Sequence, residues 1–137
     1  MYLVLKSQNI KNGKIYFNLP QHRFDEKREF EFRVVHLYVA LGHSKYTKSD
    51  LSSHLISLQS NLIDRSPFNP HQDLLFLPVS DLSAYTIYTP THFLRYKLRL
   101  QDLNDAEFFL HSENPDIISR VSFVSLQIEI IPYGWVQ

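Results

Sequence analysis

Imidazole binds transition metals and moves protons at neutral pH, so the histidines are the first candidates for chemistry. The chain has seven of them, at His22, His36, His43, His54, His71, His92 and His111. They show no closely spaced pair of the kind that holds a metal ion, and we expect each to be a solvated or hydrogen-bonded imidazole. His36 alone stands in a strongly apolar run, which favours a core histidine bonded to a neighbour over a metal ligand or a base.

Other catalytic patterns are missing from the sequence. There is no cysteine, hence no thiolate nucleophile or disulfide, and there is no glycine-rich phosphate loop or nucleophile elbow. Asp102 and Asp105 could be paired carboxylates, but they stand in a predicted turn, where Asp serves the backbone. We therefore predict no enzyme, no catalytic residue, no cofactor and no metal, and we expect neither stoichiometric transition metal nor hydrolase or oxygenase activity.

A row of cations, Arg95, Lys97 and Arg99, alternates along one predicted strand and faces outward. Such a row can meet phosphate, an acidic neighbouring subunit, or water beside acids on adjacent strands such as Glu129. The solvated face is the favoured interpretation, and a subunit contact comes second.

Four aromatic residues are candidates for a platform that stacks on a sugar ring, namely Tyr85, Tyr88, Tyr133 and Trp135. No cluster of Asn, Asp and Gln flanks them, as a sugar site would need for hydrogen bonding. Core or interface aromatics are therefore the favoured interpretation.

Composition limits the classes of protein to consider. The 137 residues carry 14 basic and 14 acidic side chains, so the chain lacks the positive charge with which proteins bind nucleic acid. No apolar run approaches the ~20 residues of a membrane span, and no signal peptide is expected. The 10 Phe and 8 Tyr beside only 3 Gly favour an all-β core.

Residues 28–41, REFEFRVVHLYVAL, read as the central strand. Phe30, Phe32 and Val34 alternate with the charged residues Glu29, Glu31 and Arg33. Beyond Val34 the charges stop, and uninterrupted alternation predicts that Val35, Leu37, Val39 and Leu41 make the opposite face apolar as well. A covered second face requires either residues 46–70 folded back over it or a neighbouring subunit.

The other strands are shorter and end at Pro, Gly or polar turns. They are predicted at residues 2–6, 15–19, 74–77 (ended by Pro78), 85–88, 92–101, 106–110 and 121–131, with turns at Asn12-Gly13 and residues 102–105. Residues 46–63 are ambiguous, because Leu51, Leu55, Leu58 and Leu62 form a helical stripe, while the Ser-rich composition weakens a helix and a short strand over residues 54–59 is equally possible. The predicted core is Phe30, Phe32, Val35, Leu37, Val39, Leu98, Leu100, Val124, Leu126 and Ile128.

About eight short strands with long connections predict an antiparallel β-sandwich, specifically a single jelly roll over residues 1–137. Several segments resemble the penton-type minor capsid proteins of polinton-like and adintovirus-like DNA viruses. These segments are MYLVLKSQN, IYFNLPQHRF, FEFRVVHLYVAL, HLISLQSNLIDRSPFNPHQDLLFLPV, FLRYKLRLQDLNDAEFFL and VSFVSLQIEI. The resemblance also implies a strand within residues 54–63.

The resemblance implies a virion structural protein that forms a homopentameric ring at the fivefold vertices of a capsid and contacts a major capsid protein. It implies no specific nucleic acid partner and no membrane span. The alternative is a jelly-roll module that binds a carbohydrate through Tyr85, Tyr88, Tyr133 or Trp135.

Overall fold

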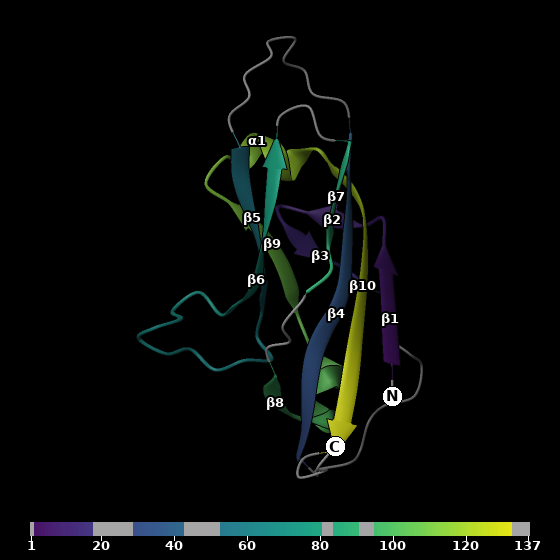
Figure 1. The fold of residues 1–137 in the computed structure, drawn as a ribbon, viewed down its shortest axis with the longest axis vertical. Coiled ribbons are helices and arrows are strands. Elements are labelled where there is room, and N and C mark those ends of the chain that lie inside the picture. The colour runs from purple at the N-terminus through teal and green to yellow at the C-terminus, as the bar shows by residue number, and fades with distance from the viewer. Residues whose placement is uncertain (1, 18–28, 43–52, 81–83, 91–94, 133–137) are drawn as a thin grey trace.

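The computed structural model describes residues 2–17, 29–42, 53–80, 84–90 and 95–132. They form an all-β structure of two antiparallel sheets (Figure 1). Sheet A contains β1 (Tyr2–Ser7), β4 (Glu29–Leu41), β7 (Tyr85–Tyr88), β8 (Tyr96–Arg99) and β10 (Val121–Pro132). Sheet B contains β2 (Ile10–Lys11), β3 (Lys14–Ile15), β5 (Ser53–Ser60), β6 (Asp73–Ser80) and β9 (Phe108–Ser112).

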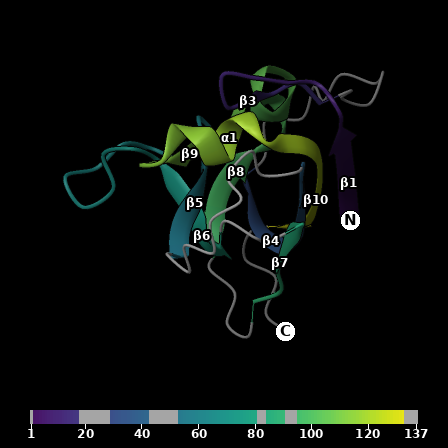
Figure 2. The same cartoon turned by 90° about the horizontal axis from the view of Figure 1, so that it is seen from above.

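Strand order differs strongly from chain order. Sheet A runs β1-β10-β4-β7, and because β10 occupies one side of β4, the short strands β7 and β8 share the other side, one after the other. Sheet B runs β2-β3-β9-β5-β6. Seen from above, β5, β6 and β9 lie on one side and β1, β4, β7 and β10 on the other (Figure 2).

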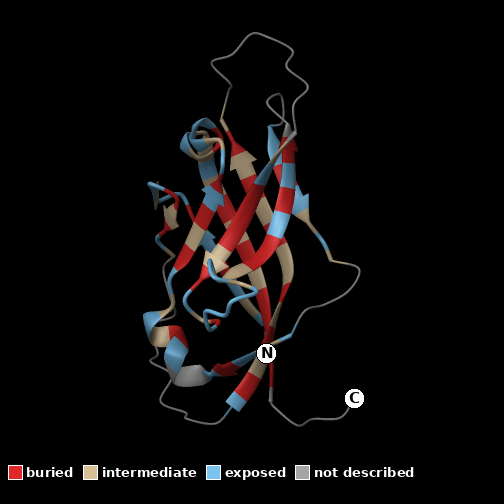
Figure 3. Cartoon of the chain, turned by 90° about the vertical axis from the view of Figure 1, so that its left-hand side faces the viewer, coloured by how far each residue is buried: buried red, intermediate tan, exposed pale blue. Residues whose placement is uncertain are grey.

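One hydrophobic core lies between the two sheets. The strands alternate between buried and more exposed residues (Figure 3), as expected when one face of each sheet is covered. Phe32, Leu37 and Leu126 of sheet A and Ile56 and Phe108 of sheet B are almost completely buried. The two sheets form a sandwich-like arrangement with a shared interior.

A β-bulge at Val35 corrects our interpretation of the central strand. Gln127 of β10 lies opposite His36, but the next residue, Ile128, lies opposite Val34, so Val35 is an extra residue in β4. An extra residue inverts the alternation. Buried positions therefore change from even to odd along β4: Phe30, Phe32 and Val34 before the bulge, and Leu37, Val39 and Leu41 after it. All six face the same core, and the predicted second apolar face does not exist.

The predicted core is otherwise largely confirmed. Val35 is half-buried rather than buried, and the side chain of Leu100 lies outside the described ones. The other eight predicted core residues are buried: Phe30, Phe32, Leu37, Val39, Leu98, Val124, Leu126 and Ile128.

Residues 53–60 form strand β5, which confirms the strand interpretation and excludes a helix there. The strand pairs with β6 on one side and β9 on the other, so Leu55 and Leu58 point to opposite faces, exposed and buried respectively. Pairing with two neighbours overrides the helical spacing of the leucines. Residues 46–52, and with them Leu51, lie outside the described part.

Pro78 does not end its strand, contrary to our prediction, because β6 continues to Ser80. The carbonyl of Pro78 accepts a hydrogen bond from the Thr86 hydroxyl of β7 at 3.2 Å. Backbone N and C=O of one strand residue point to the same side, so the nitrogen of Pro78 points away from β5. Proline is tolerated because β6 is the edge strand of sheet B.

The connections contain further differences. The alternation expected over residues 92–101 ends at Arg99, and a 3₁₀-helix, η1 (Leu100–Asp105), replaces the predicted turn; residues 91–94 lie outside the described part. The strand predicted at 106–110 runs from Phe108 to Ser112.

A short helix, α1 (Pro115–Ser119), begins after Asn114. The side chain of Asn114 accepts a hydrogen bond from the Asp116 amide.

The first hairpin follows the Asn-Gly rule. Asn12 and Gly13 both have positive φ, 52° and 84°, as a type I′ turn between antiparallel strands requires. A Cβ on Gly13 would collide with the carbonyl oxygen of Leu110. The strand expected at 15–19 is shorter within the described residues and ends at Ile15; residues 18–28 lie outside them.

Leu126→Ala and Leu98→Ala are each expected to lower the free energy of unfolding by roughly 2–5 kcal/mol, because each leaves a cavity at a buried position. Chemical denaturation measures the change. Unaltered midpoints for both variants would contradict the strand register described here.

Deletion of Val35 is expected to cost far more than Val35→Ala. Without the extra residue, the apolar side chains of the two halves of β4 cannot all face the core. We expect the free energy of unfolding to fall by more than about 4 kcal/mol, or the protein not to fold. Val35→Ala keeps the bulge and trims a half-buried side chain, with an expected cost of about 1 kcal/mol. Equal effects in denaturation experiments would show that the bulge does not set the phase of the strand.

Candidate functional site

The structure places four of the seven histidines, and none of the four is fully buried. His36 is half-buried at the bulge, opposite Gln127 on the outer face of sheet A, so the prediction of a core histidine is wrong. His54, His71 and His111 line one hollow on sheet B. His22, His43 and His92 lie outside the described residues. Within the described part, no three His, Asp or Glu side chains gather closely enough to hold a metal ion.

Asp102 and Asp105 do not form a paired site. Both belong to η1 and are exposed. The carbonyl of Asp105 accepts a hydrogen bond from the side-chain amide of Asn61 at 3.0 Å. This hydrogen bond connects η1 to the first residue of the 61–72 loop.

Aromatic side chains gather on the outer face of sheet A. Tyr38 of β4 is stacked with Tyr85 of β7, with ring centroids 5.8 Å apart and planes 22° apart. Phe123 of β10 lies on the other side of Tyr38, at 6.3 Å. Ile87 lies beside Tyr38 in the β4–β7 register. We call these four residues the outer aromatic surface; Tyr85 and Ile87 are 55% and 49% exposed.

Of the four candidate platform residues the structure describes Tyr85 and Tyr88, and these two do not share a face. Tyr85 faces outward, but Tyr88 is half-buried and packs against the core, and Tyr133 and Trp135 lie outside the described residues. Sequence reasoning missed Tyr38, because an uninterrupted alternation in β4 places it inside. The sequence holds no signal for the change of phase, because Val34 and Val35 are both apolar.

The cationic row of β8 is confirmed as an exposed face beside acids. Arg95, Lys97 and Arg99 are all exposed, and the β4–β8 register places Glu31 opposite Lys97 and Glu29 opposite Arg99. Arg95 forms an ion pair with Glu31 at 3.5 Å. Exposed pairs of this kind contribute little to stability.

Glu129 is not a partner of this row, because it binds Arg33 on the neighbouring strand. The Nε and Nη2 atoms of Arg33 donate to Glu129 Oε2 at 3.2 and 2.7 Å, and both side chains are mostly buried. The Arg33 hydrogen bonds lower the pKa of Glu129 below its usual 4.5; burial acts in the opposite direction, and a hydrogen bond from Tyr2 adds to the lowering.

Glu129→Gln is expected to lower the free energy of unfolding at pH 7 by about 1–3 kcal/mol, through loss of charge-assisted hydrogen bonds. Because the folded-state pKa is depressed, this contribution is present above pH 4.5 and is lost as the pH falls through the lower folded-state value. Denaturation of both proteins between pH 7 and pH 2 should show their stabilities converging in acid. A difference that is constant with pH would contradict the ionic origin.

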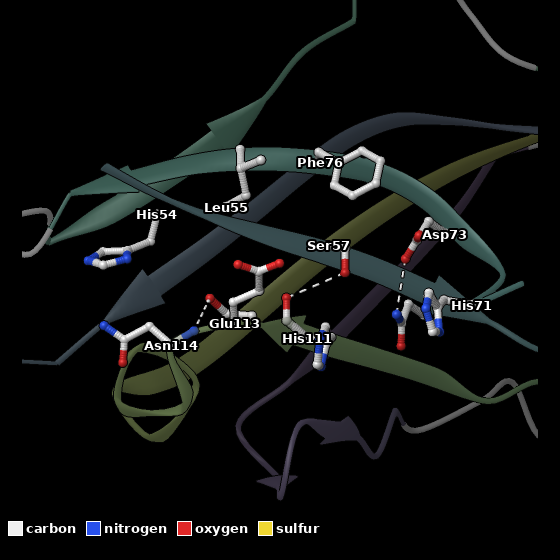
Figure 4. A pocket seen from close by; sticks show the side chains of 11 residues that line it. His54, Leu55, Ser57, His71, Asp73, Phe76, His111, Glu113 and Asn114 are labelled. Carbon is white, nitrogen blue, oxygen red and sulfur yellow. Dashed lines mark hydrogen bonds between the residues drawn. The ribbon is translucent and has the colours of Figure 1, made fainter. Parts of the chain in front are cut away.

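An open hollow of about 430 Å³ lies on the outer face of sheet B (Figure 4). Leu55 of β5 and Phe76 of β6 line it and are 59% and 55% exposed. Its polar lining is internally bonded: Gln59 Nε2 donates to Asp73 Oδ1 at 3.0 Å and Ser57 Oγ to the His111 carbonyl at 3.4 Å. We call it the β5–β6 hollow.

The imidazoles around the β5–β6 hollow do not converge. His54 lies at one end and His71 at the other, with His111 from β9 between them, and the rings point apart (Figure 4). General acid–base chemistry needs groups within hydrogen-bond reach of one reacting atom. An apolar rim with separated polar groups instead suits the binding of another side chain.

Comparison with known proteins identifies no relative. No protein-family model matches the chain, and neither the curated proteins nor the solved structures contain a match. In the described part of the chain, no helix has the length and apolar character to cross a membrane.

Proposed function

We propose that the chain is a single jelly roll. The strand pairs β1·β10, β3·β9 and β5·β6, together with β4 and the consecutive pair β7 and β8, support this topology. In these pairs, a strand from the first half of the chain (β1 to β5) lies antiparallel to a strand from the second half (β6 to β10), as in one long hairpin. Rolling such a hairpin alternates its strands between two sheets, which produces the two Greek keys of a jelly roll.

The proposed function is that of a structural protein that acts through subunit contacts, as a vertex or minor component of a viral capsid. The outer aromatic surface carries this proposal. It spans three adjacent strands on the face turned away from the core, where Tyr85 and Ile87 are about half-exposed. Exposed aromatic clusters of this kind are typical of protein interfaces.

The resemblance to penton-type minor capsid proteins supplies the class of assembly, a closed ring of identical subunits at a fivefold vertex. Closed rings satisfy a heterologous contact without an open end. Because of the bulge at Val35, β4 has no second apolar face that a neighbouring subunit would have to cover. The expectation of assembly therefore depends on the surface of the molecule rather than on its core.

A carbohydrate-binding module is the second candidate, and the Tyr38–Tyr85 pair favours it. The two rings are nearly parallel on a sheet face, with Tyr85 more than half-exposed, and aromatic side chains give binding sites large apolar contact area. In this version the ligand, rather than a second subunit, covers the outer aromatic surface.

The double variant Tyr85→Ser/Ile87→Ser separates the two functions. If the proposal holds, light scattering at high concentration shows a multimer for the wild type, and the variant dissociates with at least a tenfold weaker association constant. Val4→Ser is the matched control, because Val4 is exposed on β1 of the same sheet. At dilutions where all three proteins are monomeric, their melting temperatures should agree, since the altered side chains are exposed.

A wild type that is monomeric at every concentration, and isolated in electron micrographs, would contradict the assembly function. Glycan-array binding that disappears in Tyr38→Ala would then establish the carbohydrate-binding alternative. Multimers that are unaffected by Tyr85→Ser/Ile87→Ser would place the interface elsewhere on the molecule.

A further inference from the structure

Phe68 is the most exposed large apolar side chain described in this chain, at 99%. It lies in the loop of residues 61–72 between β5 and β6, which extends away from both sheets (Figure 1). A fully exposed aromatic ring forgoes the hydrophobic stabilisation that its burial would contribute. No described part of the same chain covers the Phe68 ring, so a contact for it must be sought on another molecule.

The tip of this loop is a tight, hydrogen-bonded turn. The amides and carbonyls of Ser66 and Asn69 bond each other at 3.4 and 3.1 Å, and the Ser66 hydroxyl accepts from the Asn69 amide at 3.0 Å. Pro67 precedes Phe68 at the first central position of the turn, where its fixed φ is favourable. The turn therefore presents the Phe68 ring in a defined place.

Further hydrogen bonds fix the loop near the residues where it leaves and re-enters sheet B. The Gln72 side chain donates to the Ile63 carbonyl at 2.6 Å, and Asn69 exchanges two side-chain hydrogen bonds with the backbone of Asp73, at 3.0 and 2.9 Å. Gln72 has a positive φ of 58°, a conformation that non-glycine residues adopt only where the surroundings enforce it. An exposed aromatic residue on a preordered loop is the usual form of an interface anchor.

A receptor for such an anchor exists on the same chain. The β5–β6 hollow, at about 430 Å³, is larger than the ~150 Å³ that suffices to hold a benzene ring. Leu55 and Phe76 supply exposed apolar contacts there. Phe68 is itself fully exposed, so it does not occupy the hollow of its own chain, and a contact between the two surfaces must join two molecules.

The charges beside the two surfaces are complementary. Arg65 is exposed three residues before Phe68, whereas Asp73 and Glu113 line the hollow. Opposite charges at the rim of a contact guide its register. A lipid surface is a poorer partner for the loop, since membrane-binding segments add several cations to their apolar residues and residues 61–72 hold only Arg65, opposed by Asp64.

We propose that the Phe68 loop of one molecule inserts Phe68 into the β5–β6 hollow of a second copy of this chain, with Arg65 facing Glu113. The inference depends on the proposed function only in that the partner is another copy. Anchor and receptor are different surfaces, so the contact closes either as a pair in which each molecule inserts its loop or as a ring.

Sedimentation equilibrium of single variants tests the contact. Phe68→Ser and Phe76→Ser are each expected to weaken self-association more than tenfold. Tyr16→Ser, at an exposed tyrosine on neither surface, should change it less than twofold. Because these side chains are exposed, melting temperatures measured at dilutions where every protein is monomeric should be unchanged, which separates lost contact from lost fold. Gln72→Ala should also weaken association, because it removes the hydrogen bonds that Gln72 makes to Ile63 and Arg65 and so loosens the loop.

Charge reversal supplies a second, independent measurement. Arg65→Glu and Glu113→Arg should each weaken association, and the double variant should recover most of the loss because the ion pair is restored in the opposite sense. Additive losses without recovery would overturn the assignment of Glu113 as the partner of Arg65.

The outcomes distinguish this contact from the proposed function. A multimer dispersed by Tyr85→Ser/Ile87→Ser but unaffected by Phe68→Ser overturns the Phe68 contact and leaves the proposed function standing. A multimer dispersed by Phe68→Ser but unaffected by Tyr85→Ser/Ile87→Ser supports the contact and moves the interface to sheet B. A monomeric wild type, or a monomer whose Phe68 binds phosphatidylcholine vesicles, overturns the contact.

Discussion

The extra residue at Val35 is the constraint on which the rest of this structure depends. The β4 strand is 13 residues long and pairs with β10 along almost its whole length. Without a change of phase, half of its apolar residues would face water. With the bulge, Phe32 and Leu37 lie in one core, and the outer face becomes free to carry Arg33 at one end and Tyr38 at the other. The same local insertion thus creates both the continuous core and the aromatic surface.

Side chains of sheet A also complete the hydrogen bonding of sheet B. The Thr86 hydroxyl donates to the Pro78 carbonyl, and the Tyr96 hydroxyl to the Leu74 carbonyl, both at 3.2 Å. Burial, followed by the nearby Tyr88, raises the pKa of Tyr96, which keeps its hydroxyl protonated as a donor. The open edge of β6 is therefore partly satisfied by β7 and β8, and the two sheets are joined by polar contacts as well as by the core.

The strands were predictable where alternation is uninterrupted and the limits are set by Pro, Gly or polar residues. β1, β7 and most of β10 are of this kind, and the Asn12-Gly13 turn follows from its positive φ values. The bulge was not predictable, because both phases of β4 are apolar near Val35. Sites made from distant segments were also beyond reach: His54, His71 and His111 are far apart in sequence, and Tyr38 meets Tyr85 only once β7 pairs with β4.

Pro78 has a consequence for how the molecule can grow into larger bodies. A fibril extends when the free edge of one sheet offers amide donors to an incoming strand. A long, regular edge strand favours such pairing. Near the C-terminal end of β6, at Pro78, the backbone nitrogen that would meet such a strand carries no hydrogen. Stacking by strand addition is thereby interrupted along this edge. Assemblies that use the β6 side must therefore depend on side-chain contacts between subunits. Such contacts can form a closed oligomer of limited size.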